Sequence, residues 1–289
     1  MTTNSSPEIS VDEDIKHILS EDHKKEANHR NNLLISWIGL MALLALVFSG
    51  LEIDLGFIQI NFIQLNIPFI KEYTPFIALG AVQTILISVV SITVAMILAL
   101  STALARLSKI APLEAISTFY ISLIRGTPLY LQIIFFFLAL PQMGIFMSGF
   151  YAGVTALGLN YGAYMSETFR AGILSVGKGQ HEAATALGMN TRQKMTYIIL
   201  PQALRVVIPP MGNDYIAMLK DSSLVSVTGF VREILWRAQK VGRQKFKNLE
   251  ALIIAAAFYW ILTLLFTAVQ ARIEKRLGQG EGEFKQLSK

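Results

Sequence analysis

Two long stretches without a charged residue decide what this chain can fold into. They are Phe76–Ala105 and Leu129–Ser166, and a shorter uncharged run, Leu33–Leu51, precedes them. A helix of about 20 apolar residues crosses the hydrocarbon core of a bilayer. Inside that core only helices and closed barrels satisfy their backbone hydrogen bonds. The sequence therefore predicts an all-α, polytopic membrane protein.

Composition narrows the chemistry. Charged residues make up 16% of the chain, compared with roughly 25% in soluble domains. There is no cysteine, and the four histidines fall mostly in the polar N-terminal tail. A disulfide framework and a thiolate site are therefore excluded, and we expect no metal or cofactor on this chain. The net charge of +5 is expected in basic loops beside the membrane, not in contact with nucleic acid.

Six spans are predicted from the uncharged runs and the turn residues between them. They cover Leu33–Leu51, Phe76–Ala105, Leu129 to near Leu140, a run that begins near Phe150, Val206–Val227 and Ala251–Ala271. The third and fourth spans are separated by a turn at Pro141-Gln142-Met143-Gly144. Basic residues before the first span and acidic residues after it predict a cytoplasmic N-terminus. Six spans then return the C-terminus to the cytoplasm.

Four segments outside these spans need separate interpretation. Residues 1–32 are predicted to be disordered or to form an amphipathic surface helix, and residues 51–74 to be extended or interfacial outside the cytoplasm. A break is predicted at 125–128, with Thr127 capping the following helix. Residues 232–247 are predicted to form a basic loop. Alternation of the spans places this loop outside the cytoplasm, against the usual excess of basic residues inside.

A polar island, Gly177–Pro201, interrupts the apolar sequence. Good helix formers predict a helix over Gln180–Leu187, and Gly188 then suits a left-handed turn. Asn190 and Gln193 have the spacing of a capping box at the start of a second helix. We expect a short helix presented to a partner outside the membrane. A DNA-binding helix-turn-helix has the same local pattern, but spans on both sides argue against it.

The island resembles the EAA signature of ATP-binding-cassette (ABC) importer permeases. The matching residues are Glu182, Ala183, Ala184 and Gly188, followed by Ile198, Leu200 and Pro201. The resemblance implies that the short helix is a coupling helix that docks into a groove on a cytoplasmic ATPase. It also implies that the first four of these residues make the coupling contact.

Further stretches resemble the polar amino acid branch of the type I importer permeases. They are Arg125–Pro128, Tyr161–Glu167, Leu200–Arg205, Pro209-Pro210 with Asn213, and Leu219–Ser226. The resemblance covers residues 76–277 and implies a permease core of five spans. The tail 1–32, the extra span with its external segment 33–75, and the tail 278–289 lie outside it. Asp214 departs from the family pattern, which more often has glutamate there.

The resemblance also implies an assembly in a bacterial cytoplasmic (inner) membrane. A second permease subunit, identical or related, would pair with this chain. Two ATPase subunits would bind ATP and magnesium on the cytoplasmic side, and an extracytoplasmic binding protein would deliver an amino acid. The chain itself has no phosphate-binding glycine loop with a lysine, so we expect it not to be an enzyme.

Polar residues inside the predicted spans are candidates for the substrate pathway. A charge at a span centre costs about 2.5–3.5 kcal/mol and is usually kept for a cavity or a partner. The candidates are Glu167, Asn213, Asp214, Lys220, Asp221, Gln83, Gln132 and Asn160. Glu167 and Arg170 have the spacing of an ion pair, and Lys220 with Asp221 is an alternative interfacial pair. Asp214 suits a cationic group of a substrate, and Lys220 a carboxylate.

Two other functional classes stay open at this point. A self-sufficient, ion-coupled secondary transporter or channel would use Glu167 and Asp214 as ion or proton sites and would work without ATP. An intramembrane enzyme would use Ser222 or Ser223 with Lys220, although hydroxyls near a span end more readily cap the backbone or line a cavity. The resemblance to the EAA signature favours the importer subunit over both.

Overall fold

The N-terminal unit, Met1–Ile67, consists of a long helix followed by a β-hairpin. The computed structural model describes residues 9–54, 59–61 and 63–287 of the chain. Helix α1 covers Ile9–Val47, and the strands β1 (Glu52–Asp54) and β2 (Gln59–Asn61) pair in antiparallel fashion. The hairpin confirms the extended conformation that the alternating sequence predicts there.

Helix α1 includes parts of two segments that we predicted separately from the sequence, the polar tail and the first span. The described part of the polar tail and the first predicted span form one uninterrupted helix, of which Asn28–Val47 is long and apolar enough to cross a membrane. The reason is local, because no glycine or proline occurs between Ile9 and Ile38. Helix propensity therefore carries the helix through the charged part. Residues 1–8 of the predicted tail lie outside the described residues.

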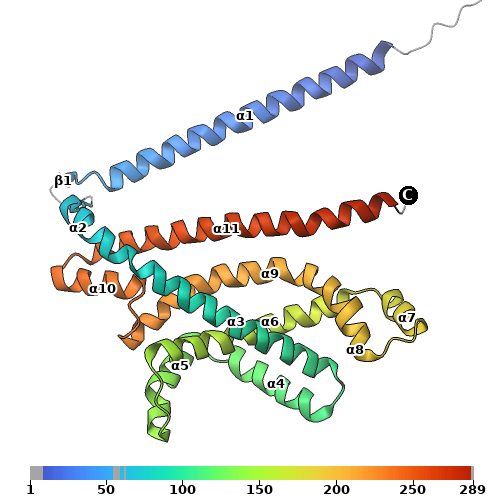
Figure 1. The fold of residues 1–289 in the computed structure, drawn as a ribbon. Helices are drawn as coiled ribbons and strands as arrows, with labels where there is room; N and C mark the ends of the chain where they lie inside the picture. Colours follow the sequence, from blue (N-terminus) through green and yellow to red (C-terminus); the bar gives the residue numbers. More distant parts are fainter. Residues whose placement is uncertain (1–8, 55–58, 62, 288–289) are drawn as a thin grey trace, which may run out of the picture. The chain divides into compact units, whose positions relative to one another are not determined.

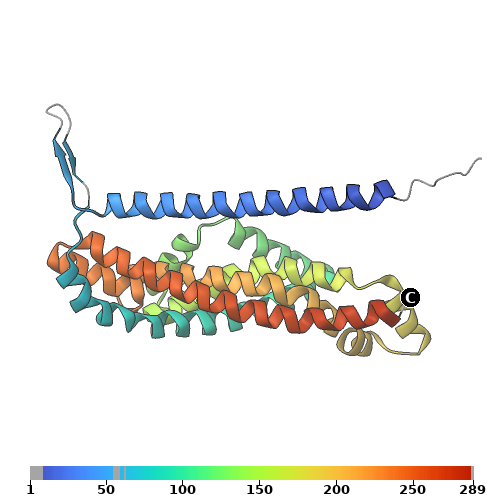
Figure 2. The ribbon, with the colours of Figure 1, turned by 90° about the horizontal axis from the view of Figure 1, so that it is seen from above.

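The C-terminal unit, Pro68–Lys289, is helical. Its α-helices are α2 (Ile67–Ala78), α3 (Gly80–Leu107), α4 (Ala111–Arg125), α5 (Leu129–Ile134), α6 (Gly149–Ser175), α7 (Lys178–Ala186), α8 (Thr191–Gln193), α9 (Leu200–Asp221), α10 (Ile234–Lys245) and α11 (Asn248–Leu287). Shorter 3₁₀ and π segments are η1 (Phe135–Ala139), η2 (Leu140–Met143), η3 (Lys194–Ile199) and η4 (Ser222–Thr228). Helices α3, α6, α9 and α11 run lengthwise through this unit (Figures 1 and 2). The all-α prediction is confirmed.

Helix α6 is the centre of the core. Its residues Leu157 and Met165 share one buried apolar cluster with Ala95 and Ala99 of α3 and with Val207 of α9. The small alanines let the helix backbones approach closely, which is how helices pack when lipid surrounds them. The core therefore fixes α3, α6 and α9 to one another.

A second apolar cluster holds the other end of the C-terminal unit. Ile77 of α2, Ile234 of α10 and Ala255 of α11 are buried in it. Gly80 allows the closest approach, because a Cβ on this residue would lie 2.6 Å from the backbone nitrogen of Ile234. The start of α10 therefore packs directly on the start of α3.

Three described segments are long and apolar enough to cross a membrane, namely Asn28–Val47, Ile67–Leu107 and Asn248–Arg276. Helices α4 and α5 with η1 and η2 add a fourth if they are counted as one broken span, bent by 103°. Helices α6 and α9 have the length of a span but carry charged residues along it. The count of six spans stays a prediction.

Three local predictions differ from the structure. The external extended segment ends earlier than expected, because α2 already begins at Ile67, with Pro68 in its first turn. Thr127 does not cap the following helix but donates its hydroxyl to the carbonyl of Leu123 (3.0 Å), at the end of α4. The predicted basic loop is mostly the helix α10.

The predicted span Val206–Val227 also has different limits. Helix α9 starts at Leu200, with Pro201 in its first turn, and gives way to the 3₁₀ segment η4 after Asp221. The Pro209-Pro210 pair lies inside the helix. The carbonyl of Pro209 accepts a hydrogen bond from the Gln270 amide of α11 (3.2 Å). This bond supplies a partner for a carbonyl near the helix-weakening prolines.

Candidate functional site

The polar island forms a short helix that closes with a tight turn. Helix α7 covers Lys178–Ala186, and Gly188 follows with a φ of +74°. This left-handed conformation favours glycine, because it has no Cβ to clash with the backbone. The amide of Gly188 donates to the carbonyl of Thr185 (2.9 Å). The predicted turn at Gly188 is therefore confirmed.

The second helix of the island starts with the predicted capping box. The Asn190 side chain accepts from the Gln193 amide, and the Gln193 side chain accepts from the Asn190 amide, both at 2.9 Å. The Lys194 ammonium group then donates to the Thr185 hydroxyl of α7 (3.0 Å). Helix α7 is thus fixed to the start of η3 by a side-chain bond as well as by its turn.

The coupling residues named from the sequence lie on different sides of α7. Glu182 and Ala183 are exposed, whereas Ala184 is buried. Leu187, which follows the helix, is 82% exposed. Ala183 and Leu187 share one side of the helix because they are four positions apart, whereas Glu182 is exposed on a neighbouring side. The sequence motif did not single out the exposed apolar side chain of Leu187.

The base of α7 connects directly to the long helices. Ile173 and Val176 at the end of α6, Ile199 of η3 and Ala203 of α9 form a small buried cluster. This cluster joins the segment before α7 to the segment after it. Figure 1 shows α7 and α8 at one end of the C-terminal unit and α10 near the other. A displacement of α7 therefore acts on α6 and α9 together.

Glu167 bridges two arginines. It accepts from Arg170 one helical turn later (2.8 Å) and from Arg106 at the end of α3. The predicted pairing with Arg170 is confirmed, and Arg106 is a partner that the sequence did not reveal. The three charged groups link α3 to α6 on the side of the core nearer to α7.

Gln132 and Asn160 form a buried amide pair at the break between α4 and α5. The Asn160 amide donates to the Gln132 side-chain oxygen (3.3 Å). The Gln132 amide donates to the Ile124 carbonyl (2.9 Å) and to the Thr127 hydroxyl (2.9 Å). These bonds satisfy backbone and side-chain groups where the helix is interrupted. Both residues stabilise the broken helix in this structure.

The residues at the end of α9 separate from one another. Asp221 accepts from the hydroxyl of Tyr161 on α6 (2.7 Å), whereas Lys220 is exposed. In the described part of the chain no ion pair joins Lys220 to Asp221. Ser222 is buried and donates to the carbonyl of Leu219 (2.7 Å). Its hydroxyl therefore caps the backbone.

The remaining candidates, Asn213, Asp214 and Gln83, lie on two helices. Asn213 accepts from Gln270 of α11 (3.0 Å). Asp214 and Gln83 are half-buried on α9 and α3. The polar residues named from the sequence therefore do not form one site. Their partners Arg106, Tyr161 and Gln270 come from distant parts of the chain, and the sequence did not single out these contacts.

Comparison with known proteins identifies a family. Residues 91–279 match the family described as binding-protein-dependent transport system inner membrane component. The L-cystine transport system permease protein TcyB of Bacillus subtilis (strain 168) is 43% identical over 208 residues, which are 72% of this chain and 88% of that protein. The arginine transport system permease protein ArtQ of the same organism is 40% identical, over 70% of this chain and 93% of the relative.

Solved structures share the fold of the C-terminal unit. A crystal structure of an amino acid ABC transporter with histidines has a TM-score of 0.69 at 36% identity, and covers 74% of this chain and 100% of the matched one. An inward-facing structure of the MetNI methionine ABC transporter has a TM-score of 0.57 at 15% identity. The match covers 74% of this chain and 99% of the matched chain. The second similarity concerns the fold alone.

Proposed function

This chain belongs to the family of binding-protein-dependent transport system inner membrane components, and on that premise we propose how it works. It is a permease subunit of an amino acid ABC transporter. In our proposal it lines the translocation pathway, and α7 is the coupling helix that seats in a cytoplasmic ATPase. The ATPase hydrolyses ATP, because this chain has no phosphate-binding loop of its own.

One observation carries the proposal, namely the exposed side of α7. Glu182, Ala183 and Leu187 are exposed on a segment whose C-terminal end is held by the turn at Gly188 and by the Lys194–Thr185 bond. An exposed apolar side chain on a rigid, otherwise polar helix suits insertion into a partner's groove. Ala184 lies on the side of the helix that packs against the rest of the protein, since it is buried.

Force on α7 reaches the pathway through packed helices. The cluster of Ile173, Val176, Ile199 and Ala203 joins α7 to α6 and α9, and Glu167 joins α6 to α3. Closure of two ATPase subunits on ATP would therefore move three long helices as a group. Packed cores transmit such displacements because they are close-packed and hardly deform.

We further propose the assembly and its orientation. A second permease subunit, two ATPase subunits and an extracytoplasmic binding protein complete the transporter. The α7 end faces the cytoplasm, so the α10 end faces the other side. Arg272 and Lys275 lie at the end of the apolar part of α11, Asn248–Arg276, and support this orientation. Helix α11 runs from α10 toward the α7 end (Figure 1), and basic residues favour the cytoplasmic side. The named substrates of the relatives, L-cystine and arginine, suggest a polar amino acid.

The coupling role is tested by two variants in the reconstituted transporter. Glu182→Lys and Gly188→Val are expected to leave the complex inserted in the membrane but to abolish substrate-stimulated ATP hydrolysis and uptake. The matched control for Gly188→Val is Gly144→Val, because Gly144 also has a positive φ (+80°) and open space around it, away from α7. Uptake that is unchanged in both α7 variants would reject the coupling helix.

A further inference from the structure

The basic residues between η4 and α11 are unusual for a segment on the proposed outer side. They are Arg232, Arg237, Lys240, Arg243, Lys245 and Lys247. Two of them have structural roles. Arg237 donates to the carbonyl of Phe76 (3.2 Å) and stacks on its ring, and Lys247 lies 3.9 Å from the carboxylate of Glu250. Lys240 and Arg243 form no ion pair in the described part of the chain.

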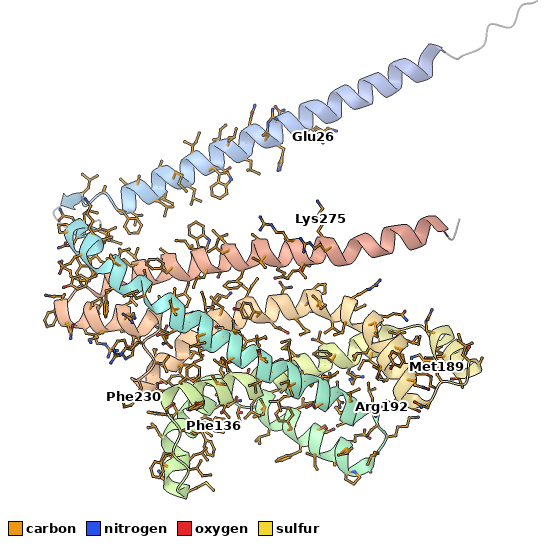
Figure 3. The ribbon with its side chains drawn as sticks, in the orientation of Figure 1. Glu26, Phe136, Met189, Arg192, Phe230 and Lys275 are labelled. Carbon is orange, nitrogen blue, oxygen red and sulfur yellow. The ribbon has the colours of Figure 1, made fainter. Side chains whose placement is uncertain are left out.

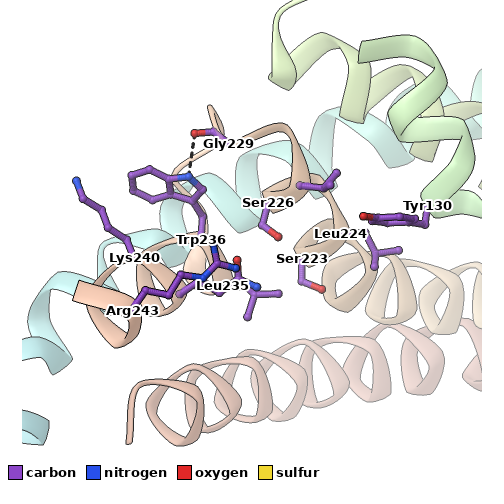
Figure 4. Close-up of a pocket in the computed structure, with 11 residues that line it drawn as sticks. Tyr130, Ser223, Leu224, Ser226, Gly229, Leu235, Trp236, Lys240 and Arg243 are labelled. Carbon is purple, nitrogen blue, oxygen red and sulfur yellow. Dashed lines mark hydrogen bonds between the residues drawn. The ribbon is translucent and has the colours of Figure 1, made fainter. Parts of the chain in front are cut away.

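Lys240 and Arg243 instead line a cavity of about 670 Å³. Helix α10 forms one wall with Trp236, Gln239 and these two cations. Segment η4 forms the other wall with Ser223 and Ser226 (Figure 4). The volume lies within the roughly 300–1,000 Å³ that small-molecule sites occupy. The space is therefore suited to a small ligand that enters between two backbone elements.

The wall formed by α10 is held rigidly. Its first turn is capped by Glu233, which accepts from the backbone amides of Leu235 (2.7 Å) and Trp236. The Trp236 indole donates to the carbonyl of Gly229 (2.9 Å), which closes the turn between the two walls. Lys240 lies over the Trp236 ring, 5.1 Å from its centre. A site on such a preorganised helix loses little entropy when a ligand binds.

The lining residues that the structure describes carry two cations and no carboxylate. Two serine hydroxyls and the Gln239 amide add neutral hydrogen-bond donors. A guanidinium group matches a carboxylate with two parallel hydrogen bonds, and an ammonium group adds a point charge. Positive charge in a concave site also attracts anionic groups from solution. The chemistry of the cavity is therefore that of a carboxylate site.

We propose that this cavity binds the carboxylate of the transported amino acid on the outer side of the permease. This inference rests on the proposed function, which places α10 opposite the coupling helix. Arg243 grips the carboxylate and the serine hydroxyls of η4 lie across the cavity, while the Lys240 ammonium group, which lies over Trp236 and points away from η4, adds positive charge from the rim (Figure 4). Basic residues on the outer side conflict with the positive-inside tendency. In this proposal Lys240 and Arg243 have a function there, because they attract the carboxylate that all amino acid substrates share.

The test compares an amino acid with its carboxamide, which lacks only the carboxylate charge. The probe is whichever of L-cystine and L-arginine the complete wild-type transporter takes up in proteoliposomes. Equilibrium binding is then measured on the purified permease–ATPase complex without the binding protein. We expect the wild type to bind the amino acid about tenfold more tightly than the carboxamide, since hydrogen bonds to charged groups are the strong ones.

Variants of Arg243 and Lys245 distinguish the loss of a cation in the cavity from the loss of a positive charge elsewhere on α10. Arg243→Gln is expected to reduce the preference for the amino acid to within about twofold, and Arg243→Lys to retain part of it. Lys245→Gln is the matched control, because Lys245 is exposed on the same helix and does not line the cavity. It is expected to keep the wild-type preference. Basal ATP hydrolysis should be equal in the wild type and in the control Lys245→Gln.

Several outcomes would overturn the proposal. They are a wild type without preference for the amino acid, an Arg243→Gln variant that keeps the full preference, an equal loss in Lys245→Gln, or binding that is seen only when the binding protein is present. The last result would place the carboxylate recognition on the binding protein. A wild-type complex that shows no ATP-driven uptake of any amino acid would instead reject the proposed function, so the two failures are distinguishable.

Discussion

The carboxylate of Glu233 accepts a hydrogen bond from the hydroxyl of Tyr259, which ties the first turn of α10 to α11. The same carboxylate caps α10 through the amides of Leu235 and Trp236. Glu233 is fully buried, and the backbone amide of Ile234 donates to Thr84 of α3 (3.4 Å). Three helices therefore meet at this residue.

The first prediction concerns the pH dependence of stability. Glu233 immediately precedes α10, and this helix of 12 residues is too short to span a membrane. Burial raises the pKa of Glu233 from 4.5 to about 7, and the hydrogen bonds from Tyr259, Leu235 and Trp236 oppose that rise. The folded state thus favours the protonated acid. Its stabilising contribution is complete below pH 4.5 and is lost as the pH rises through about 7.

This dependence is measured as the melting temperature of the purified protein between about pH 5 and pH 8. The wild type should melt at a higher temperature at the acidic end. Glu233→Gln should flatten the profile, while Glu114→Gln, at an exposed position on α4, should leave it as in the wild type. A slope that persists in Glu233→Gln would show that another group is responsible.

The second prediction concerns the contact between α3 and α10. A Cβ at Gly80 would lie 2.6 Å from the backbone nitrogen of Ile234 and 2.7 Å from the backbone carbon of Glu233. Backbone atoms cannot move aside as a flexible side chain does. Gly80→Ala should therefore lower the free energy of unfolding by about 1–3 kcal/mol. Gly179→Ala is the control, since nothing lies within 4 Å of its Cβ position. Equal melting temperatures for the two variants would contradict the close approach.

The third prediction concerns the amide pair at the helix break. Gln132→Met keeps the length of the side chain but leaves the Ile124 carbonyl and the Asn160 amide without this partner. The cost of an unsatisfied buried polar group is about 1–3 kcal/mol, and thermal unfolding in detergent measures it. Gln83→Met is the comparison, at a half-buried glutamine of α3. If both variants unfold alike, the pair does not stabilise the break.

Local signals made several parts of this fold predictable. Asn190 and Gln193 form the expected capping box, and Gly188 takes the expected left-handed conformation. Both depend only on residues within one turn of the backbone. The turn at 141–144 is found for the same reason, with Gly144 again left-handed. The long apolar runs predict helices because a bilayer leaves few alternatives.

Contacts between distant residues were not predictable. Arg106 meets Glu167 across 61 positions, and Asn160 meets Gln132 across 28. Neither pairing has a local pattern. The basic residues of α10 hid its apolar side, on which Ile234, Ala238 and Val241 are buried at helical spacing. That side packs on α3 and α11, and this packing stabilises the helix. The sequence alone does not disclose those neighbours.

The candidate coupling site could be predicted from the sequence only in part. Glu182, Ala183, Ala184 and Gly188 came from a sequence motif, and their contact with an ATPase stays a prediction. The structure adds Leu187, because exposure of an apolar side chain depends on which side of the helix packs inward. Met189 and Arg192 mark this end of the C-terminal unit in Figure 3, and Phe230 lies toward the opposite end.

The most direct measurement is cross-linking from α7 to the ATPase. The chain has no cysteine, so Leu187→Cys introduces a single thiol without background. A short thiol-to-amine reagent is applied to the assembled transporter, with Phe230→Cys as the control, because Phe230 is 74% exposed away from α7. We expect a covalent adduct of permease and ATPase from Leu187→Cys and none from Phe230→Cys. No adduct from Leu187→Cys, or equal adducts from both, would contradict the assignment of α7 as the coupling helix.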